Sequence, residues 1–179
     1  MILSSWNCRG LASKPKKLAL RDWILNSKAD IVFLQETLGN GAEVESSLKA
    51  LLPGWIFTVI DSTGHSGGLA VGFKEGSIKV INQWGTKQFL GLEVLPPVFS
   101  LPFTIVNIYG PCQGRELFWT DLMAKSLIKS SMLIVGGDLN FSIGRAEAWG
   151  PSAREDPLSD FFLNLLLDNK QNPLDQRGW

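Results

Sequence analysis

Five polar residues in this chain stand where hydrophobic runs end, and their types suit the handling of a phosphate group or a divalent metal. They are Asn7 after SSW, Glu36 in IVFLQET, Tyr109 at the end of FTIVNIY, and Asp138 and Asn140 after MLIVGG. Ligands collect where the strands of an α/β sheet end and open into loops. Together these residues predict a cleft that cuts phosphodiester bonds.

Asp138 and Asn140 form the strongest pair of this set. Gly136 and Gly137 precede them, and glycines at a strand end let the backbone come close to another group. Residues two apart on an extended segment point to the same face. The Asp138 carboxylate can then orient or deprotonate a water, and the Asn140 amide can hold a phosphate oxygen. The alternative is a local turn in which both side chains bind backbone groups.

The other three residues suit the same reaction. Glu36 is a hard oxygen ligand of the kind that Mg²⁺ or Mn²⁺ prefers. The amide of Asn7 can bind the same phosphate or a metal-bound water, and the phenol of Tyr109 can donate to a phosphoryl oxygen in the transition state. Each residue also has a plain alternative: a solvated loop glutamate, an Asx-turn and a strand-end aromatic, respectively.

Strands and helices alternate at both ends of the chain, around a run of strands linked by glycine or polar turns. Strands are predicted over residues 1–6, 31–34, 55–60, 68–73, 77–83, 89–95, 103–109 and 132–135, and helices over 16–26, 42–51, 115–129 and 158–167. Ser13 offers an N-cap for the first helix. The closely spaced strands between 55 and 95 suggest antiparallel hairpins. This order predicts an α/β fold in which two mainly antiparallel sheets pack face to face with helices outside.

Length and charge limit the possible functions. The chain has 179 residues and is 45% hydrophobic, which predicts one globular domain over residues 1–168 followed by a loose C-terminal end at 169–179. It carries 17 Lys and Arg against 17 Asp and Glu. A sequence-independent DNA coat would be basic, so neutrality argues against that role more than against a nuclease.

Cys8 and Cys112 are too few for a disulfide framework or a zinc site, and we expect free thiols in a reducing compartment. The N-terminal residues do not resemble a signal peptide, and no apolar run reaches the roughly 18 residues of a membrane helix. These features predict an intracellular protein without membrane contact, located in the nucleus if it acts on DNA.

With these motifs in this order, the chain resembles the endonuclease/exonuclease/phosphatase superfamily, which has the deoxyribonuclease-I-like fold. The matching segments are WNCRG, LQET, SGGLAV, NIYGP and GGDLN. The stretch over residues 149–160, WGPSAREDPLSD, is similar to the apurinic-endonuclease-like domain of plant LINE-type retrotransposons. The likeness extends over nearly the whole chain.

The resemblance implies a four-layer α/β sandwich and cleavage of phosphodiester bonds by activated water with Mg²⁺ or Mn²⁺. It places Glu36 and Asn7 at the metal, Asn7 and Asn140 near the scissile phosphate, and Tyr109 on the phosphate. Asp138 is implied as the water-orienting base or proton shuttle. DNA is the implied partner, and no protein partner is evident.

One family feature is missing from the sequence. Members of the family end with a Ser-Asp-His motif, but the single histidine here is His65, which precedes the SGGLAV segment and suits a loop. We therefore expect a C-terminally truncated relative with an incomplete sheet, an exposed edge strand and very low activity, because oriented proton transfer contributes about 10²–10⁴-fold.

Three functions stay open at this stage. The first is a Mg²⁺-dependent endonuclease domain of a retroelement that nicks DNA. The second is a phosphatase of phosphoinositides or nucleotides from the same superfamily, and the third is a non-catalytic remnant. A basic cluster of Lys14, Lys16, Lys17 and Arg21 either touches the DNA backbone beside the Asn7 loop or forms a solvated helix face.

Overall fold

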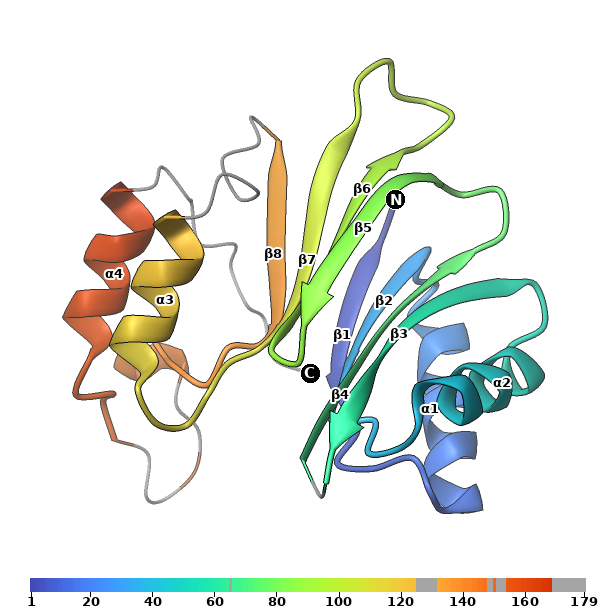
Figure 1. The fold of residues 1–179 in the computed structure, drawn as a ribbon, viewed down its shortest axis with the longest axis horizontal. Coiled ribbons are helices and arrows are strands. Elements are labelled where there is room, and N and C mark those ends of the chain that lie inside the picture. The colour runs from blue at the N-terminus through green and yellow to red at the C-terminus, as the bar shows by residue number, and fades with distance from the viewer. Residues whose placement is uncertain (65, 125–131, 148–149, 151–153, 169–179) are drawn as a thin grey trace. The chain divides into compact units, whose positions relative to one another are not determined.

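The strands of the chain form two four-stranded sheets, and helices alternate with the strands along the sequence (Figure 1). The computed structural model describes residues 1–64, 66–124, 132–147, 150 and 154–168. Its strands are β1 (Leu3–Asn7), β2 (Ile31–Gln35), β3 (Trp55–Thr63), β4 (Ser66–Lys74), β5 (Lys79–Thr86), β6 (Phe89–Leu95), β7 (Phe103–Tyr109) and β8 (Leu133–Asp138). Its helices are α1 (Lys14–Asn26), α2 (Gly41–Leu51), α3 (Arg115–Ala124), the 3₁₀ helix η2 (Arg145–Glu147) and α4 (Ser159–Asp168).

Both sheets are mixed. The first has the order β1-β2-β4-β3 and the second the order β5-β6-β7-β8. The pairs β1-β2 and β7-β8 are parallel, and the other pairs are antiparallel. Parallel pairing brings two carboxyl ends together in each sheet, with Asn7 opposite Gln35 and Tyr109 opposite Asp138. The predicted fold class, two mainly antiparallel sheets with flanking helices, is confirmed.

One predicted hairpin does not exist. The strands β4 and β5 follow each other closely but belong to different sheets. A turn at Lys74–Ser77, closed by the bond from the Ser77 N–H to the Lys74 carbonyl, ends β4, and Ile78 then enters the core between the sheets. Spacing alone could not tell this crossover from a hairpin, because both need the same short polar turn with a glycine.

The first sheet is buried on both faces, which explains the uninterrupted apolar run of β2. Ile31 and Phe33 join the apolar cluster between the two sheets. Val32 and Leu34 join the cluster under α1 and α2, which lie on the side of this sheet away from the second sheet (Figure 1). A strand covered on both sides needs no polar alternation.

Side-chain caps set the starts of the two helices that cover the first sheet. The Ser13 side chain accepts a hydrogen bond from the Lys16 N–H, as predicted, and the Asn40 side chain accepts one from the Ala42 N–H. Each satisfies a backbone donor that has no partner within the helix. The predicted helix over 115–129 extends over Arg115–Ala124, and its remaining residues lie outside the described part of the chain.

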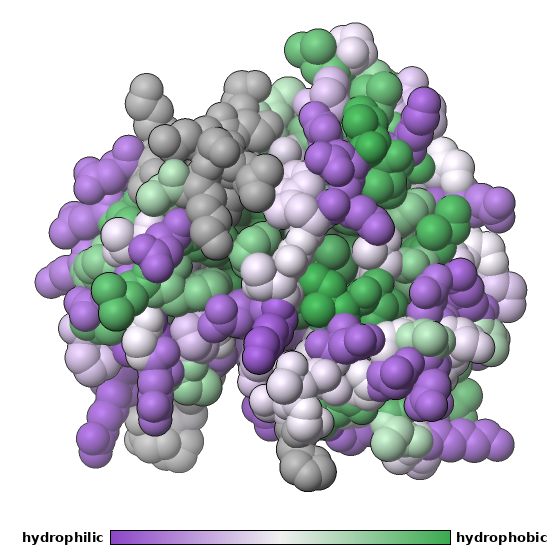
Figure 2. Space-filling view, in the orientation of Figure 1, coloured by the Kyte–Doolittle hydropathy of each residue, from purple (hydrophilic) through white to green (hydrophobic). Residues whose placement is uncertain are grey.

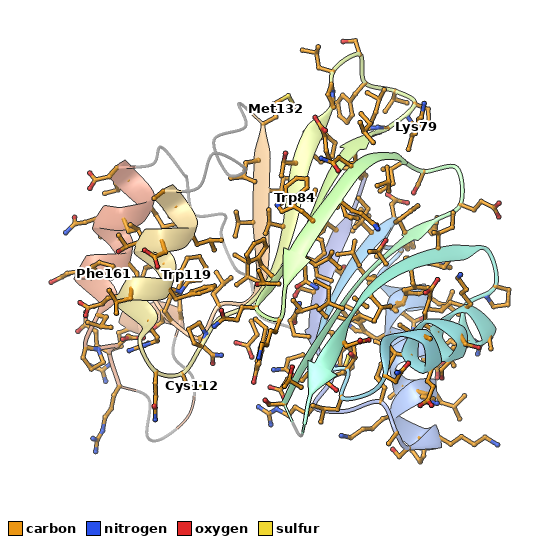
Figure 3. The ribbon with its side chains drawn as sticks, viewed as in Figure 1. Lys79, Trp84, Cys112, Trp119, Met132 and Phe161 are labelled. Atoms are coloured by element: carbon orange, nitrogen blue, oxygen red, sulfur yellow. The ribbon has the colours of Figure 1, made fainter. Side chains whose placement is uncertain are left out.

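The helices α3, η2 and α4 form a second compact unit, whereas the first unit holds the described strands with α1 and α2. The core of the second unit is aromatic. Trp119 of α3, labelled in Figure 3, is 1% exposed and meets Phe141 and Phe162 edge-on, and the rings of Phe141 and Phe162 stack at 4.1 Å. The single domain over 1–168 stays a prediction, and the predicted loose end lies outside the described residues.

Most large apolar side chains are buried, but the turn between β6 and β7 is an exception. Val98, Phe99 and Leu101 are exposed there, and green atoms mark this end of the sheet in Figure 2. In the described part of the chain, no helix has the length and apolar character needed to cross a membrane.

A buried amide side chain joins the two sheets. Asn107 of β7 has no exposed surface. Its Nδ2 donates to the backbone carbonyls of Leu34 and Ala70 in the first sheet, both at 3.0 Å, and its Oδ1 accepts from Gln35 Nε2 at 2.6 Å. Gln35 Nε2 also donates to the hydroxyl of Ser5 at 3.1 Å. Asn107 therefore locks the sheets in one lateral register directly beneath the carboxyl ends of β1 and β2.

We predict that Asn107→Ala destabilises the protein, because it removes one buried hydrogen bond from the Gln35 amide and one from each of two carbonyls. Each buried polar group that loses its bond costs about 1–3 kcal/mol. The free energy of unfolding, measured by urea titration, is expected to fall by at least that amount. Asn82→Ala, on the exposed surface of β5, is the matched control and should stay within about 0.5 kcal/mol. Equal effects of the two substitutions would contradict the assigned role of Asn107.

Candidate active site

Two carboxylates from different sheets meet at one amide. Asn7 at the end of β1 donates through Nδ2 to Glu36 Oε1 at 2.7 Å and to Asp138 Oδ2 at 2.6 Å. Glu36 directly follows β2, and Asp138 ends β8. The structure thus brings together three of the five predicted site residues, which lie up to 131 positions apart in the chain.

The orientation of the Asn7 amide is fixed from its other side. Its Oδ1 accepts a hydrogen bond from the Arg9 N–H at 3.0 Å, so its nitrogen faces the acids. The loop after β1 is also tied to the loop after β2, since the Gly10 N–H donates to the Glu36 carbonyl at 2.8 Å. The Asx-turn considered as an alternative for Asn7 therefore exists, and it operates together with the contacts to the acids.

The backbone around Glu36 is held in an unusual conformation. Arg9, Glu36 and Leu38 have φ angles of 45°, 52° and 48°, a region that residues other than glycine enter rarely and at a cost of about 1–3 kcal/mol each. Two bonds from β4 hold this loop, because the N–H groups of Thr37 and Leu38 donate to the carbonyls of Gly68 and Gly67. A side chain at Gly68 would overlap the Thr37 hydroxyl, and Gly67 has a φ of 82°, which explains the two glycines of SGGLAV.

The end of β8 approaches β7 just as closely. Gly137 has a φ of 130°, and a Cβ there would overlap the carbonyl oxygen of Ile108. Tyr109 lies opposite Asp138 in this parallel pair, and the Gly110 N–H donates to the Asp138 carbonyl at 2.8 Å. Half-buried Tyr109 also packs against the apolar cluster between the sheets. It is thus held at the same strand end as the aspartate.

Asn140 belongs to the second unit. The predicted same-face placement of Asp138 and Asn140 assumed an extended segment, but β8 ends at Asp138 and Asn140 has a φ of 53°. That assumption was wrong, because a left-handed residue turns the chain out of the strand direction. The Asn140 carbonyl accepts a hydrogen bond from Arg115 Nη1 at 3.0 Å.

A cavity of about 370 Å³ lies beside Asn7. Its lining is partly apolar and partly basic, and consists of Trp6, Asn7, Cys8, Arg9, Leu11, Lys16, Ala19 and Leu20. The Lys16 ammonium donates to the Arg9 carbonyl, so one member of the predicted basic cluster does lie beside the Asn7 loop. His65, the sole histidine of the sequence, lies outside the described residues.

The sequence model of the endonuclease/exonuclease/phosphatase family matches residues 4–164. The chain belongs to this family. Its members are hydrolases that include nucleases and phosphatases, and they generally use divalent metals. The match covers every site residue described above.

Solved structures show the same fold at low sequence identity. An AP endonuclease from Archaeoglobus fulgidus superposes with a TM-score of 0.70 at 13% identity over 94% of this chain and 70% of that chain. The endonuclease domain of TRAS1, a telomere-specific non-LTR retrotransposon, gives 0.63 at 17% over 92% and 70%. The mannosyl-6-phosphatase Bt3783 of Bacteroides thetaiotaomicron VPI-5482 gives 0.59 at 13% over 78% and 65%. The chain thus spans about two thirds of their lengths, and a comparison with curated proteins found no match.

The residues of this family member fit a hard divalent cation. In the described residues, no group of three or more His, Cys, Asp and Glu side chains could hold a metal. The site instead offers the two carboxylates of Glu36 and Asp138 on one amide nitrogen. Mg²⁺ is held in proteins by one or two carboxylates with several waters completing its shell, so this donor set is sufficient.

Sequence reasoning missed the residues that support the site. Asn107 and Gln35 fix the strands beneath the acids, and Arg115 with Asp156 holds the Asn140 segment. The position of Asn107 inside the apolar run FTIVNIY was a usable signal, because proteins seldom bury a side-chain amide without a hydrogen-bond partner. Nothing in the sequence pairs Arg115 with Asp156, 41 positions later.

The two cysteines should differ sharply in reactivity. Burial raises the pKa of the Cys8 thiol to about 12, partly offset by Lys16 and reinforced by Glu36, so Cys8 stays protonated at neutral pH. Cys112, labelled in Figure 3, is exposed. Because the thiolate is the reactive form, we expect iodoacetamide at about pH 8 to modify Cys112 and spare Cys8, as read by peptide mass spectrometry. In denaturant both should react, and equal rates in the folded protein would refute the burial argument.

Acid should weaken the second unit through Asp156. Hydrogen bonds from Arg115 lower the pKa of this carboxyl below its ordinary value. The resulting stabilisation is present above the pKa of the unfolded carboxyl and is lost as the pH falls through the lower folded pKa. The free energy of unfolding should therefore fall more steeply below about pH 4 in the wild type than in Asp156→Asn. Urea titrations on both sides of that pH measure it, and parallel curves would show that the pair contributes nothing.

Proposed function

We propose that this chain is a divalent-metal-dependent phosphodiester hydrolase that nicks DNA. The observation that carries the proposal is the bridge of Asn7 between Glu36 and Asp138. Two carboxylates on one amide nitrogen repel each other, and a cation held by Glu36 offsets that repulsion. Membership of a hydrolytic family that generally uses divalent metals supports the same conclusion.

Glu36 is the proposed metal ligand, and Asn7 keeps its carboxylate in place. When bound, Mg²⁺ or Mn²⁺ neutralises phosphate charge and helps the leaving oxygen depart. Asn7 stays a predicted second ligand, although binding through its oxygen requires the amide to turn away from the Arg9 N–H. The left-handed backbone at Glu36 supports a functional role, because such strain concentrates at active sites.

Asp138 is the proposed base that accepts a proton from the attacking water. The Tyr109 phenol and the Asn140 amide donate hydrogen bonds to phosphoryl oxygens as their negative charge grows in the transition state. Half-buried Tyr109, opposite Asp138 in the ladder, suits this assignment.

DNA is the proposed substrate, and the nucleus is the corresponding location. The support is the similarity of residues 149–160 to plant LINE-type elements and the fold shared with a retrotransposon endonuclease domain and an AP endonuclease. A neutral chain is compatible with a short contact on DNA. The second candidate is a phosphatase, favoured by the shared fold with a mannosyl-6-phosphatase. A non-catalytic remnant is the third.

We predict that Glu36→Gln and Asp138→Asn separate binding from chemistry. Glu36→Gln should weaken Mn²⁺ binding, followed by electron paramagnetic resonance, while Asp138→Asn should reduce the nicking of supercoiled plasmid in Mg²⁺ by about 10²–10⁴-fold. Neither should lower stability much, because each removes one of two repelling charges. Asn7→Ala should weaken Mn²⁺ binding by about 10–100-fold, as expected for a group that orients a ligand.

Glu43→Gln is the matched control, because it neutralises an exposed carboxylate in the first turn of α2. It should leave binding and nicking unchanged. Faster cleavage of a phosphate monoester than of plasmid would favour the phosphatase. If the wild type nicks no faster than Asp138→Asn and binds no Mn²⁺, the hydrolase proposal fails. Mn²⁺ binding without cleavage of either substrate would identify a remnant.

A further inference from the structure

An ion pair between Arg115 and Asp156 holds the backbone carbonyl of Asn140. Arg115 Nη1 donates to the Asn140 carbonyl at 3.0 Å and to Asp156 Oδ2 at 2.6 Å, and Arg115 Nη2 donates to Asp156 Oδ1 at 2.9 Å. Both oxygens of the aspartate are thus engaged by the fork of the guanidinium. We call this set of contacts the Arg115–Asp156 clamp.

The clamp is less exposed and has more partners than a surface ion pair. The side chains of Arg115 and Asp156 are 19% and 10% exposed. The N–H groups of Ser142 and Leu158 also donate to Asp156, at 3.4 and 3.0 Å, and the guanidinium lies over the ring of Phe162 at 5.5 Å. Bidentate, partly buried pairs of this kind are strong and geometrically specific, whereas exposed pairs contribute little.

The backbone of Asn140 has an unfavourable conformation that requires support from neighbouring groups. Asn140 is left-handed, with a φ of 53°, and asparagine tolerates this conformation better than most residues but does not enforce it. Asp156 reaches the same loop again at the Ser142 N–H. The clamp therefore holds the backbone at the Asn140 carbonyl and at the Ser142 N–H, and so restrains the backbone from which the Asn140 side chain extends.

We propose that Arg115 and Asp156 are positioning residues for the hydrolysis: they fix the backbone of Asn140 and through it the amide that binds the phosphate. This inference rests on the proposed function of Asn140. A misplacement of about 1 Å in a catalytic constellation costs about 10²-fold in rate. Lysine cannot replace arginine here, because one ammonium does not reproduce the planar fork that binds Asp156 and the carbonyl together.

A purely structural ion pair would behave differently. It would join the start of α3 to the segment before α4 and affect stability, whatever residue stood at position 140. A positioning pair acts through Asn140, so its effect on catalysis disappears once the Asn140 side chain is gone. Double-mutant cycles measure this dependence directly.

The first experiment compares Arg115→Lys, Asn140→Ala and the double variant in Mg²⁺-dependent cleavage of a fluorescent DNA duplex. Arg115→Lys should lower kcat by about 10–100-fold with little change in KM, and it should cause no further loss in the Asn140→Ala background. Lys49→Arg is the control, since Lys49 is exposed on α2 and pairs with Glu45 at 2.6 Å, and the substitution keeps its charge. Losses that multiply in the double variant would overturn the proposal.

The second experiment reads the clamp without any activity. Asn140-Phe141 is the single Asn-Phe sequence in the chain, so protein with ¹³C-carbonyl asparagine and ¹⁵N-phenylalanine gives one carbonyl–amide correlation peak in the NMR spectrum. Arg115→Lys and Asp156→Asn should each move the carbonyl shift of that peak upfield, as a lost hydrogen bond does, and Lys49→Arg should not.

The cleavage assay and the NMR peak distinguish a failure of the clamp from a failure of the proposed function. An unmoved peak overturns the clamp, even in an active enzyme. A wild type without Mg²⁺-dependent cleavage, but with a peak that moves, overturns the proposed hydrolase function and the catalytic part of this inference, and leaves the backbone contact as a structural one.

Discussion

The arrangement of the two sheets depends on the hydrogen bonds of one buried amide. Apolar packing between sheets is strong but tolerates sliding, because it has no directional component. Asn107 removes that freedom. Its two donors and its acceptor are all used by groups of the first sheet, and any shift between the sheets would leave them unpaired in the interior. Polar groups in such a place specify one arrangement among several that would bury similar apolar area.

The site depends on that arrangement, because its acids come from different sheets. Glu36 is carried by β2 and Asp138 by β8, and Asn7 bonds to both. Gln35, the residue before Glu36, is itself the partner of Asn107. The network that fixes the sheets therefore ends one residue from the acid proposed to hold the metal. The backbone at Glu36 is left-handed, and the hydrogen bonds from the following two residues to β4 hold it in this conformation. These bonds restrain the position of the Glu36 carboxylate.

The sequence predicts most of the elements, since apolar runs and turn residues are local signals. The strands Phe89–Leu95 and Phe103–Tyr109 have the predicted bounds. The crossover from β4 to β5 was not predictable, because a short turn with glycine serves a hairpin and a change of sheet equally well. The convergence of Asn7, Glu36 and Asp138 was expected from strand ends and from family resemblance. The bonds of Asn107 and the Arg115–Asp156 clamp on Asn140 depend on contacts between distant segments that no local pattern encodes.

The span of the bridge between Asn7 and Asp138 has a consequence for the order of assembly. The two residues are 131 positions apart, and Asp138 lies at the end of the last described strand of the second sheet. During synthesis, the first sheet and its two helices can therefore form on the ribosome while the acid cluster is still incomplete. The cluster of Asn7, Glu36 and Asp138 therefore exists only after β8 has docked on β7, and partial unfolding of β8 separates Asp138 from the other two residues.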